Sequence, residues 1–286
     1  MSDPPVVLSI AGYDPSSGAG ITADIKTAAS QGCFAVTCIT ALTVQSSQGV
    51  FGVQPLEPDL ISRTLAALAD DLEIAAVRIG MLGSGEIAEV VAKFLGKNKL
   101  PNVVLDPVMR SSSGTELLDR AGVEILRTKL IPLCDVVTPN INEAAILAGA
   151  EPLAAETSWD DALPQLRRWA SRIHDLGSRG VVITGGHLRP ANDYLSYESC
   201  CKSESLGENA SEGSSGGFCE EVILGERLES RSTHGTGCAF AAALACQLAL
   251  GRDLSQAVRA AKDYVRRAIV AAYPVGKGIG PVNHLV

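Results

Sequence analysis

Residues 6–28, VVLSIAGYDPSSGAGITADIKTA, contain a strand, a glycine-rich turn and the start of a helix. The run 6–11 is nearly all apolar and rich in β-branched residues, which is typical of a strand buried on both faces of a parallel sheet. After the turn, Ile21, Ile25 and Ala28 recur at helical spacing. A strand that passes through a tight turn into a helix predicts the first unit of an α/β fold.

The same alternation continues along the rest of the chain. Apolar runs that predict further strands lie at residues 35–44, 75–81, 103–106, 135–138 and 181–184. Apolar residues at helical spacing predict helices near residues 60–68, 87–94, 160–176, 237–250 and 254–271. We therefore predict one α/β domain over residues 1–286, with a mostly parallel, doubly wound sheet, right-handed crossovers and helices on both faces.

One segment departs from this alternation. Residues 196–217, SYESCCKSESLGENASEGSSGG, are rich in Ser, Glu and Gly and offer little to bury. We predict a flexible surface insertion between strands near 193–197 and 220–224. The adjacent Cys200 and Cys201 are interpreted as incidental.

Composition excludes several classes of protein. The 286 residues hold 24 Lys and Arg against 32 Asp and Glu, and the net charge of −8 argues against a nucleic-acid binder, which needs a basic face. The longest apolar runs are too short to cross a bilayer, and the first residues lack the features of a signal peptide. We therefore expect a cytoplasmic protein with no membrane partner and with its eight cysteines reduced.

The strongest chemical signal is STHGTGC at residues 232–238, directly before an apolar helix. The glycines let several backbone N–H groups point at one spot, where the helix N-terminus adds partial positive charge. Such a nest suits a phosphoryl group in transfer. Cys238 falls in the first turn, where a thiol pKa of about 8.5 should be lowered, so we predict a proton acceptor beside an anion hole. The alternative, a small buried cysteine at a helix start, explains the surrounding glycines less well.

Three other polar groups follow predicted strands. Asn140 and Glu143 have the spacing of a helix capping box, and the same carboxylate could hold a hydrated Mg²⁺; the sequence leaves both open. Asp106 precedes Pro107 and could fix a turn or face phosphates through Mg²⁺. Gln45 offers a donor and an acceptor that suit an aminopyrimidine edge, although a solvated loop glutamine is the ordinary alternative.

Taken in order, the chain resembles the hydroxymethylpyrimidine/phosphomethylpyrimidine kinases of thiamine biosynthesis. The segments that carry the resemblance are IAGYDPSSGAGITADIKT, CITALTVQ, IGMLGS, LDPVM, VTPNINEA, ITGGH, HGTGC and GPVNH. They span the whole chain except the insertion at 196–217. The resemblance implies a ribokinase-like three-layer sandwich with a small flap, ATP as co-substrate, Mg²⁺ and a homodimer. It departs from the familiar motif at Tyr13, Ser17 and Arg110.

The resemblance also implies a role for each site residue. Gln45 would read the pyrimidine edge, in a pocket lined by Gly12, Asp24, Met81 and Val108. Mg²⁺ would be organised by Asp106 and Glu143, and the nucleotide would be approached by Asn140, Thr184 and Gly186. The anion hole would be formed by Gly235, Thr236 and Gly237, with Cys238 as the base. His187 is expected to be structural, and His234 could be either structural or part of the hole.

The resemblance implies a reaction in which ATP phosphorylates 4-amino-5-hydroxymethyl-2-methylpyrimidine and then its monophosphate to the diphosphate. A pyridoxal or pyridoxine kinase of the same fold is the alternative within enzymes, because its substrate is also a small heteroaromatic alcohol. The alternative from another class is a non-catalytic sensor that binds a pyrimidine or a nucleotide. Candidates for every catalytic part argue against the sensor.

Overall fold

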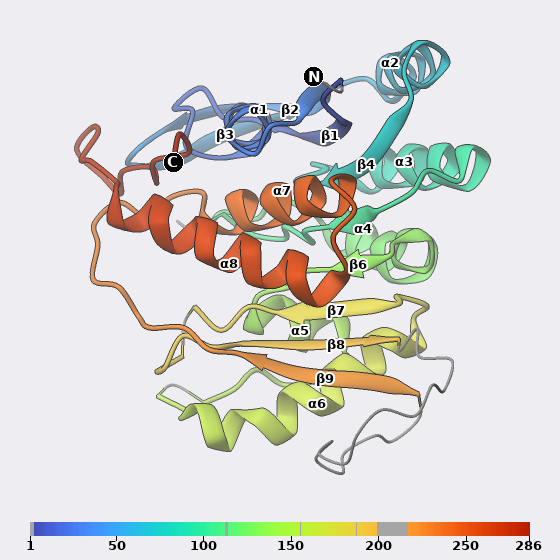
Figure 1. Ribbon diagram of the computed structural model, residues 1–286. Coiled ribbons are helices and arrows are strands. Elements are labelled where there is room, and N and C mark those ends of the chain that lie inside the picture. The colour runs from blue at the N-terminus through green and yellow to red at the C-terminus, as the bar shows by residue number, and fades with distance from the viewer. Residues whose placement is uncertain (1–2, 112–113, 155, 187, 199–216) are drawn as a thin grey trace.

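The computed structural model describes residues 3–111, 114–154, 156–186, 188–198 and 217–286. Over these residues the strands form one sheet in the order β3-β2-β1-β4-β5-β6-β7-β8-β9 (Figure 1). Their bounds are β1 (Val6–Tyr13), β2 (Phe34–Ser46), β3 (Gly49–Pro55), β4 (Ile74–Ile79), β5 (Val103–Leu105), β6 (Val136–Val137), β7 (Gly180–Ile183), β8 (Asp193–Glu198) and β9 (Phe218–Ile223). The predicted α/β fold with a mostly parallel sheet is confirmed.

The six central strands, β2-β1-β4-β5-β6-β7 in sheet order, run parallel. At the ends of the sheet, β3 pairs antiparallel with β2, β8 with β7 and β9 with β8. Because parallel strands end at the same edge, the loops after β1, β5 and β6 meet there. Each of the strands predicted from the apolar runs is present. β3 was not predicted, because its sequence GVFGVQP is interrupted by glycine and gives a weak alternation.

Helices cover both faces of the sheet (Figure 1). Their bounds are α1 (Gly20–Ser30), α2 (Pro58–Asp71), α3 (Gly85–Asn98), α4 (Arg120–Ile125), α5 (Ile141–Leu147), α6 (Trp159–Asp175), α7 (Thr236–Ala249) and α8 (Leu254–Val270). A π-helical turn, Leu126–Leu130, and a short 3-10 turn, Ile131–Leu133, follow α4. Among the described residues, no helix is both long enough and apolar enough to span a membrane.

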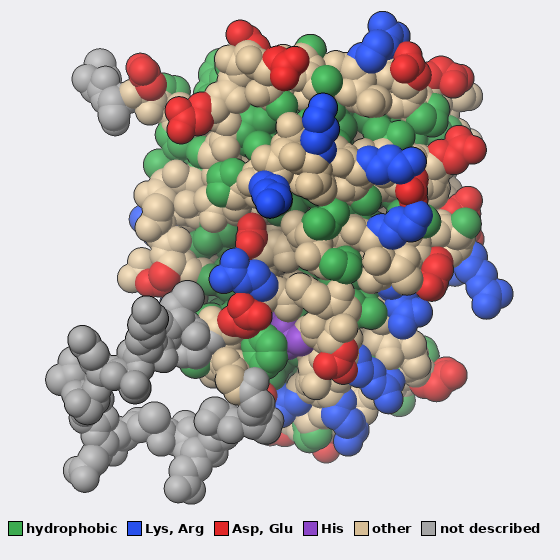
Figure 2. Space-filling view, turned by 90° about the vertical axis from the view of Figure 1, so that its right-hand side faces the viewer, with side chains coloured by type: hydrophobic (Ala, Val, Ile, Leu, Met, Phe, Trp, Pro, Cys, Tyr) green, Lys and Arg blue, Asp and Glu red, His purple; other side chains and the backbone are tan. Residues whose placement is uncertain are grey.

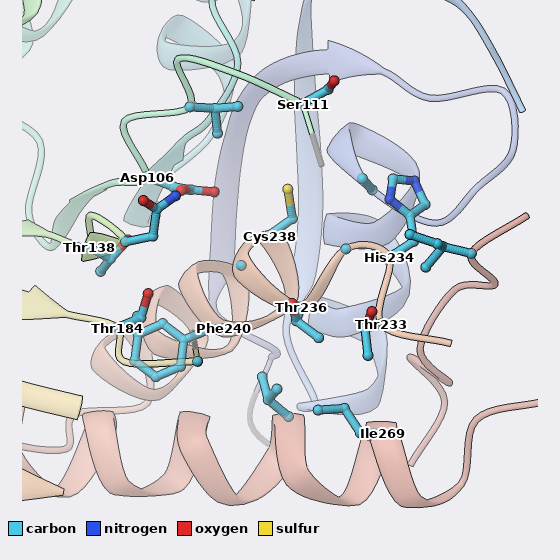
Figure 3. A pocket seen from close by; sticks show the side chains of 18 of the residues that line it. Asp106, Ser111, Thr138, Thr184, Thr233, His234, Thr236, Cys238, Phe240 and Ile269 are labelled. Atoms are coloured by element: carbon cyan, nitrogen blue, oxygen red, sulfur yellow. The ribbon is translucent and has the colours of Figure 1, made fainter. Parts of the chain in front are cut away.

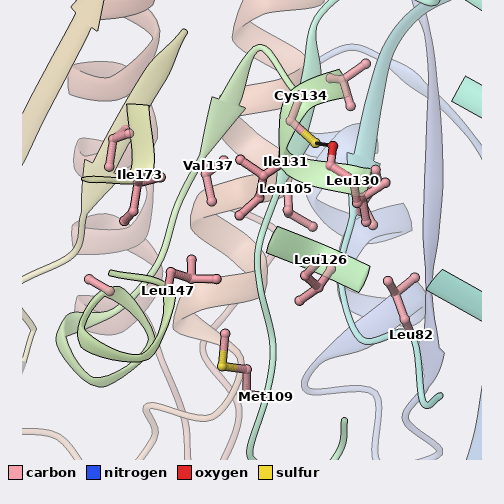
Figure 4. Close-up of a cluster of buried hydrophobic side chains, with 14 of the residues drawn as sticks. Leu82, Leu105, Met109, Leu126, Leu130, Ile131, Cys134, Val137, Leu147 and Ile173 are labelled. Atoms are coloured by element: carbon pink, nitrogen blue, oxygen red, sulfur yellow. Dashed lines mark hydrogen bonds between the residues drawn. The ribbon is translucent and has the colours of Figure 1, made fainter. Parts of the chain in front are cut away.

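Two buried clusters hold the layers together. One joins the sheet to α2, α3, α5 and α6, and Figure 4 shows part of it, where Leu105, Leu126 and Val137 are in the same cluster. The other joins the opposite face of the sheet to α1, α7 and α8. The helix α7 is buried nearly all round because it lies between the sheet and α8. Its N-terminus is therefore held rigidly against the edge where the parallel strands end.

The predicted insertion at 196–217 falls mainly on residues 199–216, which lie outside the described residues. Its described flanks belong to β8 and β9, which pair antiparallel, so the segment connects two neighbouring strands. On the face of the molecule shown in Figure 2, basic and acidic side chains are interspersed over the surface.

Candidate active site

A cavity of about 1530 Å³ opens where the parallel strands end. Its walls come from the loops after β1, β5 and β6, from the β2–β3 flap and from the first turn of α7. In open α/β sheets this edge is where ligands bind. The predicted site residues that line the cavity are Gly12, Gln45, Met81, Asp106, Val108, Asn140, Glu143, Thr184, Gly186, Gly235, Thr236, Gly237 and Cys238.

The glycine-rich turn before α7 forms the floor of the cavity. Gly235 is the N-cap residue with a φ of 85°, a left-handed conformation that favours glycine. A Cβ at this position would lie 1.8 Å from the carbonyl oxygen of Gly18. The N–H groups of Gly237 and Cys238 have no helical acceptor, since the residues four positions earlier precede the helix. Nothing lies within 4 Å of the place where a Cβ of Gly237 would be, so the turn is open to a ligand.

The thiol of Cys238 projects from the first turn of α7 into the cavity, between Asp106 and His234 (Figure 3). The expectation that the helix N-terminus lowers its pKa is wrong. Burial raises the pKa of Cys238 to about 11, and although the Arg78 charge opposes this, the charges of Asp106 and Asp24 add to it. At neutral pH the side chain is therefore a thiol.

The prediction that Asp24 lines the pocket is contradicted by the structure. Asp24 is 2% exposed, is not among the cavity-lining residues, and receives a hydrogen bond of 2.5 Å from the Ser9 hydroxyl. Its Oδ2 also lies 3.2 Å from Nη1 of Arg78, a fully buried arginine that sequence reasoning missed. Burial raises the pKa of Asp24 to about 6, although Arg78 opposes the shift. Asp24 therefore lies beneath the cavity floor, where it forms an ion pair with the buried arginine.

The two open interpretations of Asn140 and Glu143 can now be compared with the structure. The capping box is present: Glu143 N donates to the Asn140 side chain at 3.0 Å, and Asn140 N donates to Glu143 Oε2 at 2.9 Å. Burial raises the pKa of Glu143 to about 8, and the nearby charge of Asp106 adds to the shift. Two repelling carboxylates at the end of the strands fit a divalent cation, which would relieve the repulsion.

Within the described residues, no group of three or more His, Cys, Asp or Glu side chains is arranged to hold a metal ion. A cation near Asp106 and Glu143 would therefore also need oxygens from a bound nucleotide. This is the usual way in which Mg²⁺ is held in phosphoryl-transfer enzymes, with few carboxylates and several water or phosphate oxygens. The residues present fit that arrangement.

A second cluster lies on the flap side of the cavity. Nε2 of His234 is 2.8 Å from Oδ2 of Asp14 and 3.1 Å from the Gln45 side-chain amide. Burial alone would raise the pKa of Asp14, but hydrogen bonds from His234 and Ser16 hold it below its usual value. The sequence left open whether His234 is structural or part of the anion hole. In the structure, His234 connects the loop before α7 to the loop after β1. Asp14 was missed because its partner lies 220 residues away.

At the other end of the cavity, Thr184 and Gly186 follow β7. Thr184 N donates to the Pro139 carbonyl at 2.9 Å, which places Thr184 beside Asn140. Residues of α8 that no sequence pattern singled out also line the cavity, among them Lys262, Arg266 and Ile269. His187 lies outside the described residues.

The fold and the cavity together define a class of protein, the small-molecule kinases with a ribokinase-like fold. The chain belongs to the phosphomethylpyrimidine kinase family, whose model matches residues 14–283. It is similar to the hydroxymethylpyrimidine/phosphomethylpyrimidine kinase of Streptomyces coelicolor, with 40% identity over 98% of this chain and 94% of that protein. It is also similar to the pyridoxine kinase of Bacillus subtilis, with 34% identity over 97% of this chain and 94% of that protein.

Two solved structures share the fold closely. An ADP complex of Bacillus subtilis pyridoxal kinase has a TM-score of 0.81 and 33% identity, covering 98% of this chain and 97% of its own. The phosphomethylpyrimidine kinase of Clostridium difficile has a TM-score of 0.74 and 33% identity, covering 93% of this chain and 99% of its own.

Proposed function

We propose that this chain transfers the γ-phosphoryl group of ATP to 4-amino-5-hydroxymethyl-2-methylpyrimidine, and then phosphorylates the monophosphate to the diphosphate used in thiamine biosynthesis. The observation that carries the proposal is the first turn of α7, where main-chain N–H groups without a helical acceptor and the Cys238 thiol line one cavity with Asp106. The relatives named for this activity support the choice of substrate.

Catalysis comes mainly from positioning and from charge stabilisation. The phosphoryl group in transfer carries negative charge on its equatorial oxygens, and Gly237 and Cys238, whose N–H groups have no helical acceptor, line the cavity. Gly235 and Thr236 shape the turn that presents them. Because these donors are main-chain groups at the start of a buried helix, they need no rearrangement during the reaction.

Cys238 accepts the proton of the substrate hydroxyl group. With a pKa raised to about 11, the thiolate is a minor form at neutral pH but a strong base. In a loose transition state the attacking oxygen gives up its proton late, so Cys238 has to accept the proton only near the end of the phosphoryl transfer. Asp106 lines the same cavity as this thiol.

Asp106 and Glu143 would hold Mg²⁺ together with phosphate oxygens, and Asn140, Thr184 and Gly186 would contact the nucleotide. A bound Mg²⁺ supplies charge neutralisation on the transferred phosphate. On the opposite side, Gln45 would contact the pyrimidine edge, with Gly12, Met81 and Val108 against the flat ring. The sulfur of Met81 packs so near Gly12 that a Cβ there would lie 2.9 Å from it.

Mass analysis of the products tests the proposal. After incubation with ATP, Mg²⁺ and the pyrimidine alcohol, we expect the mass of one added phosphoryl group, followed by the mass of two. An unchanged pyrimidine in the presence of active, ATP-binding protein would contradict the proposal.

A second candidate substrate is pyridoxal or pyridoxine, favoured by the similarity to proteins named as kinases of these compounds. Comparing kcat/KM for the pyrimidine alcohol and for pyridoxal under the same conditions decides between them. We expect the larger value for the pyrimidine alcohol; the reverse order would assign the chain to the second activity.

We also propose a cytoplasmic homodimer. The flap supports the dimer, because Val44 on β2 and Phe51 on β3 are 67% and 66% exposed and could be covered by a second copy. Sedimentation analysis should give a mass twice that of the chain, and Phe51→Asp should shift it toward the monomer.

A further inference from the structure

Arg78 on β4 is a fully buried arginine at the edge where the site lies. It is 0% exposed, and its neighbours in the sheet are Ser9 on β1 and Val104 on β5. Two residues earlier on the same face of β4 is Ala76, which packs in the cluster beneath α7. Arginine is rarely buried without a charged partner, since taking its charge out of water is costly.

Two carboxylates from different elements flank the guanidinium group. Nη2 lies 2.8 Å from Oδ2 of Asp106, which follows β5, and Nη1 lies 3.2 Å from Oδ2 of Asp24 on α1. The charge of the same guanidinium also acts on the Cys238 thiol of α7, where it opposes the rise of the thiol pKa. Space is reserved for the group by Gly80, where a Cβ would lie 1.9 Å from Nη1.

Stability alone explains this arrangement poorly. Among the described residues, Nε and Nη1 of Arg78 have no hydrogen-bond partner, and neither does Oδ1 of Asp24. A buried ion pair with unsatisfied atoms is often less stable than apolar residues of the same volume. Asp24 is also fixed from the other side by the Ser9 hydroxyl at 2.5 Å. The guanidinium therefore has a fixed anchor beneath the floor and a second carboxylate that faces the cavity.

We propose that Arg78 is a positioning residue that holds the Asp106 carboxylate in place for the divalent cation bound with the nucleotide, with Asp24 as its anchor. This rests on the proposed role of Asp106 and Glu143 toward Mg²⁺. Arg78 lies beneath the cavity floor and acts through Asp106. Its positive charge between the two acids is the required property, so a lysine at this position should fulfil most of the role.

Calorimetry of ADP binding with and without Mg²⁺ tests the proposal without relying on turnover. In the unmodified protein, Mg²⁺ should strengthen ADP binding. In Arg78→Met we expect this enhancement to fall by about 10–100-fold, the usual cost of losing a partner that orients a metal ligand. Without Mg²⁺, the dissociation constant for ADP in Arg78→Met should stay within about threefold of that of the unmodified protein, because no nucleotide contact is removed. Arg78→Lys should keep most of the enhancement.

Two further experiments are independent of this calorimetry: enzyme kinetics of Arg78→Met, and the Gly80→Ala variant, which displaces the guanidinium group. Arg78→Met should lower kcat while the KM for the pyrimidine alcohol changes little. Gly80→Ala should reduce the Mg²⁺ enhancement in the same way, because the added Cβ pushes the guanidinium aside with the charge retained. This variant decides the question if Arg78→Met fails to fold. Leu65→Ala, a buried change on α2 on the other face of the sheet, is the control for general destabilisation and should leave the enhancement unchanged.

A folded Arg78→Met with normal Mg²⁺ enhancement would overturn the proposal, as would an Arg78→Lys variant that loses as much as Arg78→Met. If Arg78→Met does not fold, a normal enhancement in Gly80→Ala would overturn it equally. An unmodified protein that binds ADP equally with and without Mg²⁺ would overturn the metal role of Asp106 and Glu143, and this inference with it. In that last case the product masses would still test the kinase activity separately.

Discussion

The behaviour of Cys238 depends on the charges that surround it. Its thiol lies within the electrostatic influence of Asp106 and Asp24 and of the positive charge of Arg78, which is placed between these two acids. Burial and the two acids outweigh the arginine, which explains why the pKa is raised at a helix N-terminus where it would ordinarily fall. Cys238 is thus a protonated group in the absence of ligands.

Replacing this thiol tests its role directly. Cys238→Ala should lower kcat by about 10²–10⁴-fold, the range typical for loss of a general base, because the substrate hydroxyl loses its proton acceptor. ADP affinity, measured by calorimetry, should stay close to that of the unmodified protein, since the main-chain N–H groups remain. The half-buried Cys219 on β9 provides the matched control, and Cys219→Ala should leave kcat unchanged. Near-normal turnover in Cys238→Ala would remove the assigned role.

The pH dependence of turnover follows from the same pKa. A base with a pKa of about 11 has a deprotonated fraction that grows roughly tenfold per pH unit below that value. We therefore expect kcat to rise with pH between about 6.5 and 9, measured at saturating substrates, and we expect Cys238→Ala to lose this rise. A flat profile in the unmodified protein would show that the thiolate is not needed.

Among the elements, helix α7 determines where the negative charge is stabilised. It is buried from Ala239 to Gln247, and its first turn begins at Gly235, which packs directly on the Gly18 carbonyl. The loop after β1 and the loop before α7 are further joined by His234 and Asp14. Two loops far apart in the sequence therefore form one wall of the cavity.

Adding a side chain at this bend should disable the turn. Gly235→Ala has to adopt a φ of 85° at a cost of about 1–2 kcal/mol, and its Cβ would collide with Gly18. We expect kcat to fall by about 10²–10³-fold, as for loss of a main-chain donor to the transition state. Gly251 at the other end of α7 has a φ of 83° with nothing within 4 Å of the added Cβ, so Gly251→Ala carries the strain without the collision. Equal losses of kcat in both variants would show that strain alone is responsible.

At the scale of the whole molecule, the cavity joins strand ends, flap, α7 and α8, so a nucleotide that binds there should stabilise the entire fold. At a hundredfold excess over its dissociation constant, a ligand adds about 2.7 kcal/mol to the free energy of unfolding. We expect ADP with Mg²⁺ to raise the melting temperature by several degrees in the unmodified protein and in Cys238→Ala. An unchanged melting temperature at saturating ADP would contradict nucleotide binding at this cavity.

Much of this architecture could be predicted from local patterns. Apolar runs and helical spacing predicted the strands from β1 to β7, except β3, because parallel strands and the helices that cover them have clear periodicity. The glycine-rich turn before α7 was also recognisable, since its chemistry lies within a few consecutive residues. The resemblance to a family then added Gly12, Met81, Val108, Thr184 and Gly186, which line the cavity.

The remainder depends on contacts between distant parts of the chain. Asp24 looked like a pocket residue because the sequence could not show that Arg78, 54 residues later on another element, draws it inward. The pKa of Cys238 was predicted in the wrong direction because burial, the main cause of the raised pKa, depends on tertiary packing, and neither acid that adds to the shift lies nearby in the sequence. Asp14 and His234 had no local signal for their contact.

A structure with a non-hydrolysable ATP analogue, Mg²⁺ and the pyrimidine alcohol would show whether the start of α7 binds the phosphoryl group in transfer. We predict that oxygens of the terminal phosphate lie within hydrogen-bonding distance of the main-chain nitrogens of Gly237 and Cys238, with the substrate hydroxyl next to the Cys238 sulfur. A terminal phosphate bound away from the start of α7 would contradict the account.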